Sequence, residues 1–439
     1  MNRVGGNLYI SYLIATTFTT MGGGSMYKRS NYNYTVQKKS IVFIYNTLHR
    51  SFVALSKEVW NAVESQQWSL LSDYETSLLL RQGILLRSEL NEIYIFKDII
   101  QNAILRSDCM GIFLSMTSDC NLSCPYCYQD YRKETQSKRY ISEDKINTLC
   151  DFIKNIDVRE LSIVYFGGEP TINEDVLLYA MRQINSLEDV KVGNTLITNG
   201  YAVSKNLIDA IKQYGSFLLQ ITFDGNKMLH DSIRVTSDRG PTFDVIYDNL
   251  IVLADELPQK VNIRINIYSK DLTPYKSLVD DLYDRFGNKI SIYFDLIFDG
   301  QKKKNCNDVH NLTDIMELIN HSRARGFPIK LNLEKAPCVI HSRNSFALDE
   351  NLKAYVCPGK LYCDSIGNIT DDSKFEITDN EWFRYIYDPS PCVYNCLYGA
   401  LCYGGCVMNN HKCRKDDFVE LLPVIVEDKI TEYYKRAAL

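Results

Sequence analysis

Three cysteines stand close together in the 439-residue chain, in the stretch SDCNLSCPYCYQDY that begins at Ser118. Three and then two residues separate Cys120, Cys124 and Cys127. A closed zinc site needs a fourth ligand, and no other cysteine or histidine lies nearby in the sequence. A thioredoxin-like redox pair would use only two of the three. Three thiolates on one loop instead suit a 4Fe-4S cluster in which one iron has no protein ligand and can bind a reactant.

A second group of cysteines lies toward the C-terminus. Its members are Cys338, Cys357, Cys363, Cys392, Cys396, Cys402, Cys406 and Cys413. The chain has fourteen cysteines in all, and their clustering favours metal binding, because disulfide frameworks belong to small secreted domains without long helix and strand patterns. A zinc ribbon remains an alternative for the later block, since iron and zinc sites share thiolate spacing.

From residue 111 to residue 298, strand and helix patterns alternate and include six predicted strands. Apolar residues recur every three or four positions in the predicted helices, for example at Ile146, Leu149 and Ile153, as a helix that covers a sheet requires. The apolar strands predict a parallel sheet, either doubly wound or curled into a partial barrel. Ligands of such sheets bind at the carboxyl ends of the strands. The strands are expected at 111–117, 160–168, 194–200, 217–225, 261–268 and 291–298.

The regions before and after the central one have different predicted patterns of strands and helices. Residues 26–105 predict a small α+β, winged-helix-like module, with strands in 32–47, helices that begin at Ser56 and Ser72, and a strand at 91–99. Residues 1–25 are expected to be a disordered leader, with Met26 a second plausible start, and their apolar stretch is shorter than the ~20 residues of a membrane helix. Beyond residue 330 the pattern indicates turns, short strands and a final helix at 426–437.

The first cysteine loop, with Tyr126 before its third cysteine, resembles that of the radical S-adenosylmethionine (SAM) superfamily. Four further segments at predicted strand ends match the same family. The resemblance implies that Cys120, Cys124 and Cys127 hold a SAM-binding 4Fe-4S cluster and that SAM is contacted by Tyr126, Gly167, Gly168, Glu169, Pro170, Thr198, Asn199, Thr222 and Arg234. Arg264 and Asn266 are expected to share one face of their strand because side chains alternate with a period of two.

The later cysteines resemble the SPASM extension of radical SAM enzymes, and CYGGC is the most specific segment. The resemblance implies two auxiliary 4Fe-4S clusters. One would use Cys392, Cys396, Cys402 and Cys413, and the other would use Cys338, Cys357 and Cys406, with Cys363 as a possible fourth ligand. The sequence departs from the family pattern at two places. The gap between Cys392 and Cys396 is one residue longer than usual, and the stretch ENLK replaces the glycine that is expected before Cys357. Asn351 is expected to serve the tight turn there.

The resemblance implies an α/β fold with a partial (β/α)6 barrel at 106–330, the winged-helix-like domain at 26–105 and a SPASM domain at 331–439. The implied activity is reductive SAM cleavage to a 5'-deoxyadenosyl radical and the formation of a thioether or carbon–carbon cross-link in a ribosomally made peptide. The alternatives are an anaerobic sulfatase-maturing, formylglycine-forming enzyme, a peptide epimerase, and a non-catalytic metal-binding peptide scaffold. No residue is singled out as the catalytic acid or base.

The expected partners are a precursor peptide or protein and a reducing flavodoxin or ferredoxin. The formal net charge is only -5, and no basic run is interleaved with aromatic residues, so nothing indicates a nucleic-acid partner. No membrane partner is expected either, and we expect the protein to act in the cytoplasm.

Overall fold

The computed structural model describes residues 26–127, 137–296, 312–329, 344–379, 391–405, 413 and 415–437. The chain divides into two compact units. The sheet unit comprises Ala103–Leu331 and Ala336–Tyr387, and the terminal unit comprises Met1–Asn102, Asn332–Lys335 and Asp388–Leu439. The expected leader, residues 1–25, lies outside the described residues. The last segment of the chain therefore groups with the N-terminal residues, whereas the predicted domain boundaries at 105 and 330 remain predictions.

The sheet unit contains a ten-stranded sheet in the order β11-β10-β9-β8-β7-β6-β12-β13-β14-β15. Strands β6 to β11 are parallel neighbours in chain order. Their bounds are β6 (Cys109–Thr117), β7 (Glu160–Gly167), β8 (Lys191–Thr198), β9 (Phe217–Phe223), β10 (Val261–Ile267) and β11 (Ile290–Leu296). All six strands confirm the sequence prediction. Because β11 lies at one edge, the six strands form an open sheet, as a partial barrel requires.

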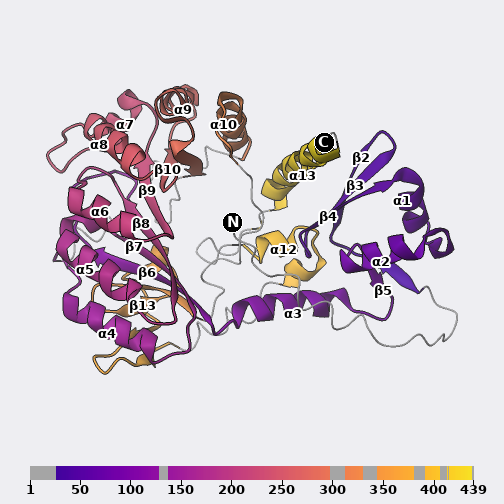
Figure 1. The fold of residues 1–439 in the computed structure, drawn as a ribbon, viewed down its shortest axis with the longest axis horizontal. Helices are drawn as coiled ribbons and strands as arrows, with labels where there is room; N and C mark the ends of the chain where they lie inside the picture. Colours follow the sequence, from indigo (N-terminus) through magenta and orange to yellow (C-terminus); the bar gives the residue numbers. More distant parts are fainter. Residues whose placement is uncertain are drawn as a thin grey trace. The chain divides into compact units, whose positions relative to one another are not determined.

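Helices follow the parallel strands and cover one face of the sheet (Figure 1). They are α4 (Glu143–Lys154), α5 (Glu174–Asn185), α6 (Lys205–Gln213), α7 (Lys227–Ile233), α8 (Phe243–Glu256), α9 (Thr273–Phe286) and α10 (Leu312–Arg325). The helical period explains the packing, since Ile146, Leu149 and Ile153 of α4 are all buried. On β6, Ile112 and Leu114 are fully buried, whereas Phe113 lies half-buried on the opposite, inner face.

A short extension continues the sheet beyond β6. Strand β12 (Ser345–Leu348) pairs with β6 in parallel, and β13 (Lys353–Tyr355), β14 (Gly367–Ile369) and β15 (Phe375–Ile377) follow as antiparallel strands. Tyr355 and Leu361 of this extension pack against Phe113 and Val164 on the inner face. The short strands expected beyond residue 330 therefore belong to the same sheet as the βα units, which the sequence pattern did not indicate.

The terminal unit contains a three-stranded antiparallel sheet of β2 (Asn33–Lys38), β3 (Ile41–Asn46) and β4 (Ser51–Ser56), and a separate pair of β1 (Tyr27–Arg29) with β5 (Leu85–Arg87). Its helices are α1 (Lys57–Glu64), α2 (Asp73–Arg81), α3 (Glu92–Ile104), α12 (Gly399–Cys402) and α13 (Lys415–Ala437). Side chains of β3 alternate: Val42 and Ile44 pack with α1 and α2, whereas Phe43 and Tyr45 pack with α13. Both faces of the three-stranded sheet are therefore covered.

The helix starts predicted at Ser56 and Ser72 are confirmed, because these serine side chains accept hydrogen bonds from the Val59 and Glu75 N–H groups. The predicted final helix is the second half of α13. In the described part of the chain, the helices are all too short or too polar to cross a membrane.

The strand predicted at 91–99 is wrong, because this segment forms the start of α3. Its isoleucines and aromatic residues favour strands locally. The buried positions nevertheless follow a helical spacing of four, at Glu92, Phe96 and Ile100. Glu92 Oε2 also accepts a hydrogen bond from the Asn31 N–H over 2.9 Å. Tertiary packing of one helical face therefore overrides the local preference.

Candidate cofactor site and active site

The three cysteines of the first group follow β6 directly, at the carboxyl edge of the parallel strands. Cys124 is buried, and Cys120 and Cys127 are half-buried. The Leu122 N–H donates to the Cys120 sulfur over 3.4 Å, and the Cys127 N–H donates to the Cys124 carbonyl over 3.1 Å. The described cysteines form no disulfide among themselves. Three thiols on one loop, one of them accepting from an N–H group, fit the donor set of an iron–sulfur cluster.

The loop is not a ready-made site for one ion. In the described ranges, no group of three or more Cys, His, Asp or Glu side chains could hold a single metal ion. A 4Fe-4S cluster does not need such convergence, because each thiolate binds a different iron. The assignment of Cys120, Cys124 and Cys127 to a cluster remains a prediction.

The Gly-Gly-Glu-Pro segment that ends β7 packs against the backbone of the cysteine loop. Gly167 has a φ of +136°, and a Cβ there would lie 2.3 Å from the Thr117 carbonyl oxygen. A Cβ on Gly168 would lie 2.0 Å from the Asp119 carbonyl oxygen. The N–H groups of Gly168 and Glu169 donate to these same two carbonyls, each over 2.7 Å. The glycines therefore allow two chain segments to meet closely.

Glu169 lies at the centre of three predicted site segments. Its carboxylate is buried and accepts from the Thr198 hydroxyl (2.7 Å), the Asn199 N–H (2.7 Å), and the Thr171 N–H and hydroxyl (3.1 and 2.8 Å). Burial raises the pKa of Glu169, and the hydrogen bonds oppose that shift. Pro170 is also buried, in the 3-10 turn Pro170–Asn173. The structure thus brings the ends of β7 and β8 together around one carboxylate, whereas their contacts with SAM remain predictions.

Tyr126 belongs to a second polar network at this edge of the sheet. Its hydroxyl donates to Asp224 Oδ2 over 2.5 Å and accepts from Arg234 Nη1 over 2.9 Å and Asn266 Nδ2 over 3.1 Å. Asn266 also donates to Asp224 Oδ1 over 3.1 Å. Arg234 is 7% exposed and Asp224 is fully buried, so the carboxylate and the guanidinium form a buried charge pair linked through Tyr126. Burial raises the pKa of both Asp224 and Tyr126.

Asp224 was missed by the sequence analysis, which singled out Thr222 two positions earlier. Thr222 is buried in β9 and pairs in register with Arg264, so their side chains lie on one face. Arg264 donates to Asn266 Oδ1 over 2.8 Å, which confirms that these two residues share a face. Arg264 also forms an ion pair with Asp295 at 3.0 Å. A signal for Asp224 was present, because it is the charged residue directly after an apolar strand.

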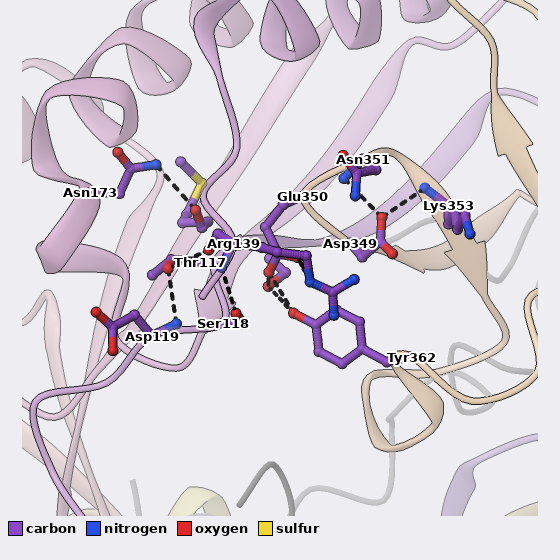
Figure 2. Close-up of polar contacts among 12 residues, drawn as sticks. Thr117, Ser118, Asp119, Arg139, Asn173, Asp349, Glu350, Asn351, Lys353 and Tyr362 are labelled. Carbon is purple, nitrogen blue, oxygen red and sulfur yellow. Dashed lines mark hydrogen bonds and ion pairs between the residues drawn. The ribbon is translucent and has the colours of Figure 1, made fainter. Parts of the chain in front are cut away.

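A third polar cluster joins the cysteine loop to the sheet extension (Figure 2). Glu350, whose side chain is 1% exposed, accepts from the Ser115 hydroxyl over 2.6 Å and from the Tyr362 hydroxyl over 2.5 Å. The Arg139 guanidinium lies 4.2 Å from the Tyr362 ring centre and 3.8 Å from Glu350 Oε2. Burial raises the pKa of Glu350. The backbone of Arg139 in turn accepts from the Ser118 N–H over 3.0 Å, so the cluster reaches the start of the cysteine loop.

The turn before Cys357 differs from the expectation for Asn351. The residue in the left-handed region is Leu352, with a φ of +62°, and its side chain is fully buried. Asp349 Oδ1 stabilises the turn by accepting from the Asn351 and Lys353 N–H groups over 2.9 and 3.0 Å (Figure 2). Asn351 therefore lies in the turn as expected, but the left-handed residue is Leu352, whose side chain is buried.

The second cysteine group is divided between the two units. Cys357 is buried and Cys363 is exposed, and both lie in the sheet unit. Four members belong to the terminal unit: Cys392 and Cys413, which are exposed, and Cys396 and Cys402, which are half-buried. Cys338 and Cys406 lie outside the described residues. The predicted ligands of one auxiliary cluster therefore all belong to the terminal unit.

Comparison with known proteins identifies the class. Residues 114–258 match the model of the Radical SAM superfamily. An uncharacterised protein from Methanocaldococcus jannaschii is 25% identical over 273 residues, which are 61% of this chain and 91% of the relative. The radical SAM cyclopropyl synthase TigE from Paramaledivibacter caminithermalis is 22% identical over 319 residues (64% and 66%). A cysteine-type anaerobic sulfatase-maturating enzyme from Clostridium novyi is 28% identical over 150 residues (31% and 38%).

Two solved structures share the fold. The enzyme anSMEcpe with bound AdoMet and Cp18Cys peptide matches with a TM-score of 0.57 and 18% identity, covering 72% of this chain and 98% of that one. Streptococcus suis SuiB bound to its precursor peptide SuiA matches with a TM-score of 0.51 and 14% identity, covering 89% and 98%.

The chain contains a radical SAM domain at residues 114–258, and the protein is an enzyme. The alternative of a non-catalytic scaffold is set aside accordingly. This domain supports SAM and a 4Fe-4S cluster as cofactors.

Proposed function

We propose that the enzyme is a maturase that installs a thioether or carbon–carbon cross-link in a ribosomally synthesised peptide. The observation that carries this proposal is the extent of the likeness to SuiB, which covers 89% of this chain, compared with 72% for anSMEcpe. SuiB was solved with a precursor peptide, and anSMEcpe with a peptide as well. Formation of a carbon–carbon bond also agrees with the relative TigE, which is named as a cyclopropyl synthase.

In this proposal Cys120, Cys124 and Cys127 hold the SAM-binding cluster, and the residues around Glu169 and Tyr126 line the SAM site. When bound, the cluster and SAM together supply a 5'-deoxyadenosyl radical that abstracts a hydrogen atom from a C–H bond of the substrate. The buried Glu169 carboxylate accepts four hydrogen bonds and so fixes the ends of β7 and β8 beside the cysteine loop. This rigidity supports a site that must orient a reactive cofactor.

Two auxiliary clusters complete the proposed set of cofactors. Cys392, Cys396, Cys402 and Cys413 would hold one, and Cys338, Cys357 and Cys406 the other, with Cys363 as a possible fourth ligand. Cys357 and Cys363 flank Leu361, which is buried in a cluster with inner-face residues of the sheet. The same inner face carries Thr222 and Arg264, so the extension borders the face on which the substrate would react.

The three-stranded sheet of the terminal unit is the proposed recognition element for the precursor. Strand β2 lies at one edge of this sheet, and most of its residues are half-buried or exposed. An edge strand of this kind can accept an extended peptide as an additional strand. A flavodoxin or ferredoxin is the proposed source of electrons.

Anaerobic reconstitution followed by incubation with SAM and a precursor peptide tests the proposal. The peptide is sought as a short open reading frame beside the gene. We expect about twelve iron atoms per chain, formation of 5'-deoxyadenosine, and a product that has lost two hydrogen atoms per cross-link. Tightly bound zinc without 5'-deoxyadenosine would overturn the assignment.

The second candidate is sulfatase maturation, which the match to the Clostridium novyi enzyme favours. Incubation with a peptide that carries a sulfatase cysteine or serine site distinguishes the two, because this activity yields formylglycine and needs no dedicated precursor. A precursor product of unchanged mass but altered configuration would instead indicate epimerisation.

A further inference from the structure

Three side chains near the N-terminus hold the loop that carries cysteines of the second group, all within the terminal unit. The Tyr32 hydroxyl donates to the Tyr394 carbonyl over 2.7 Å. The Thr47 hydroxyl donates to the Leu397 carbonyl over 2.5 Å, and Arg50 Nη2 donates to the Ala400 carbonyl over 2.8 Å. The three acceptors lie between Cys392 and Cys402, so the contacts are spread along the whole loop.

The same loop packs on one face of the three-stranded sheet. Cys396 and Cys402 contact a buried cluster that includes Phe43 and Tyr45 of β3. The Tyr394 ring lies edge-on to Phe96 of α3 at 5.4 Å between ring centres. The loop is therefore held by the packing of Cys396 and Cys402 on the sheet face and by three hydrogen bonds to its backbone carbonyls.

The loop has little regular structure of its own. It consists of a 3-10 turn (Pro391–Asn395) and the four-residue α12, which ends at Tyr403 with a φ of +50°. Carbonyl groups in such a segment have few partners within the segment and need donors from elsewhere. Tyr32, Thr47 and Arg50 supply them from three separate points, after β1, after β3 and before β4. These contacts fix the backbone on both sides of Cys396.

We propose that the N-terminal module has a second role besides peptide recognition, as the scaffold that positions the ligand loop of one auxiliary cluster. Tyr32, Thr47 and Arg50 are positioning residues for Cys396 and Cys402. The inference rests on the proposed cluster at Cys392, Cys396, Cys402 and Cys413. The module and that cluster are consequently parts of one structural unit, and removal of the module's contacts disorders the cluster ligands without altering the SAM site.

Matched substitutions in the full-length chain test the proposal. The double variant Thr47→Val and Arg50→Met removes both donors with little change of volume. The double variant Thr47→Ser and Arg50→Lys keeps a donor at each position. The control double variant Thr76→Val and Arg81→Met makes the same changes on α2 (Asp73–Arg81), where neither side chain donates a hydrogen bond to the described residues of the loop.

Two measurements apply to every variant. In the apoprotein, the rates of alkylation of Cys396 and Cys402 are followed by mass spectrometry. After reconstitution, iron and sulfide per chain and 5'-deoxyadenosine formation without peptide are measured. We expect Thr47→Val with Arg50→Met to raise alkylation by roughly tenfold and to lower iron from about twelve to about eight atoms per chain. SAM cleavage stays within about twofold of wild type, and the Ser/Lys variant restores both values.

Unchanged alkylation and full iron in the Val/Met variant would overturn the inference, as would equal effects in the α2 control. A wild type that holds only about four irons would refute the proposed auxiliary clusters instead. In that case the alkylation rates of the apoprotein still decide whether the module orders the loop. If the double variant fails to fold by circular dichroism, Thr47→Val and Tyr32→Phe, each of which removes one hydrogen bond to the loop, are measured singly by the same criteria.

Discussion

The Ser115 hydroxyl donates a hydrogen bond to the Glu350 carboxylate over 2.6 Å, although 235 positions separate the two residues in the chain. Ser115 lies on β6, and Glu350 lies in the turn between β12 and β13. The bond therefore ties the first parallel strand to the extension that carries Cys357 and Cys363.

Replacement of Glu350 by glutamine tests how much the contacts of this carboxylate contribute to stability. The amide would present an NH2 group to Arg139 where the carboxylate now presents an oxygen at 3.8 Å. We expect a cost of about 1–2 kcal/mol, visible as a lower thermal unfolding midpoint and faster labelling of the buried Cys357. The control Glu376→Gln changes an exposed carboxylate on β15 and should have no effect. Equal midpoints for the two variants would show that the tie adds nothing to stability.

Gly168→Ala is expected to disrupt the first cysteine loop. The new methyl group would stand 2.0 Å from the Asp119 carbonyl oxygen, so the loop must shift, at a cost of about 1–3 kcal/mol. The measurement is iron bound per chain after reconstitution, together with SAM cleavage. Gly215→Ala is the matched control, because a Cβ at Gly215 meets nothing within 4 Å. Normal iron content and activity in Gly168→Ala would contradict the close packing of the two segments.

Asp224→Asn is expected to impair SAM cleavage at least roughly tenfold, because the buried Arg234 loses its nearby counter-charge and Tyr126 loses its carboxylate acceptor. The rate of 5'-deoxyadenosine formation and the dissociation constant of SAM are measured with full cluster loading. Asp209→Asn on the exposed face of α6 serves as the control. If the variant binds and cleaves SAM like wild type, the network around Asp224 has no role in the SAM site.

The two cysteine groups are expected to separate in function. Cys124→Ala abolishes SAM cleavage because the SAM-binding cluster loses a ligand, whereas Cys402→Ala leaves cleavage intact but yields no modified peptide. Cys150→Ala, at a buried position of α4, should retain both activities. The measurements are 5'-deoxyadenosine and peptide mass in the same reaction. Full product from Cys402→Ala would refute a role for the auxiliary site.

Because His49 is buried, we expect the stability of the terminal unit to depend on pH. Burial lowers the pKa of His49 to about 4. Between pH 6.5 and about 4 the unfolded chain takes up a proton that folded His49 does not, so stability falls as pH falls through this window, by about 3 kcal/mol at most. Below about pH 4 this contribution does not change further. Above pH 7 the group is neutral in both states and contributes no slope.

Urea unfolding at several pH values, followed by tryptophan fluorescence, to which Trp60 and Trp68 of the terminal unit contribute, measures this dependence in wild type and in His49→Gln. The variant should show a weaker loss of stability between pH 6.5 and 4 and the same slope as wild type above pH 7. Parallel curves over the whole range would show that His49 does not cause the pH dependence.

Many elements of both units follow from local sequence. The apolar period of the α4 residues Ile146, Leu149 and Ile153 and the serine caps at Ser56 and Ser72 are short-range signals, and each predicts its element correctly. The prediction for 91–99 failed because the composition favours a strand, whereas the helix buries Glu92, Phe96 and Ile100 in tertiary contacts such as the bond from Asn31. Local signals therefore suffice where packing agrees with them.

The candidate site shows the same division. Cysteine spacing and the segments at the strand ends are visible in the sequence, because neighbouring parallel strands end at one edge and bring these residues together. The role of the glycines against the cysteine loop and the burial of Asp224 beside Arg234 depend on the fold. So does the left-handed turn at Leu352 in place of Asn351, since burial of its side chain offsets the backbone cost.

The sequence by itself determined the class of enzyme, the succession of strands and helices, and the cysteines available to hold clusters, since all of these are properties of short stretches. Only the tertiary structure decided which stretches meet. It joined β12 to β6, placed Glu350 against Ser115, and set Tyr32, Thr47 and Arg50 on the loop of the second cysteine group. The physical reason is that these contacts link residues hundreds of positions apart, and their partners are chosen by burial and hydrogen bonding in the folded chain.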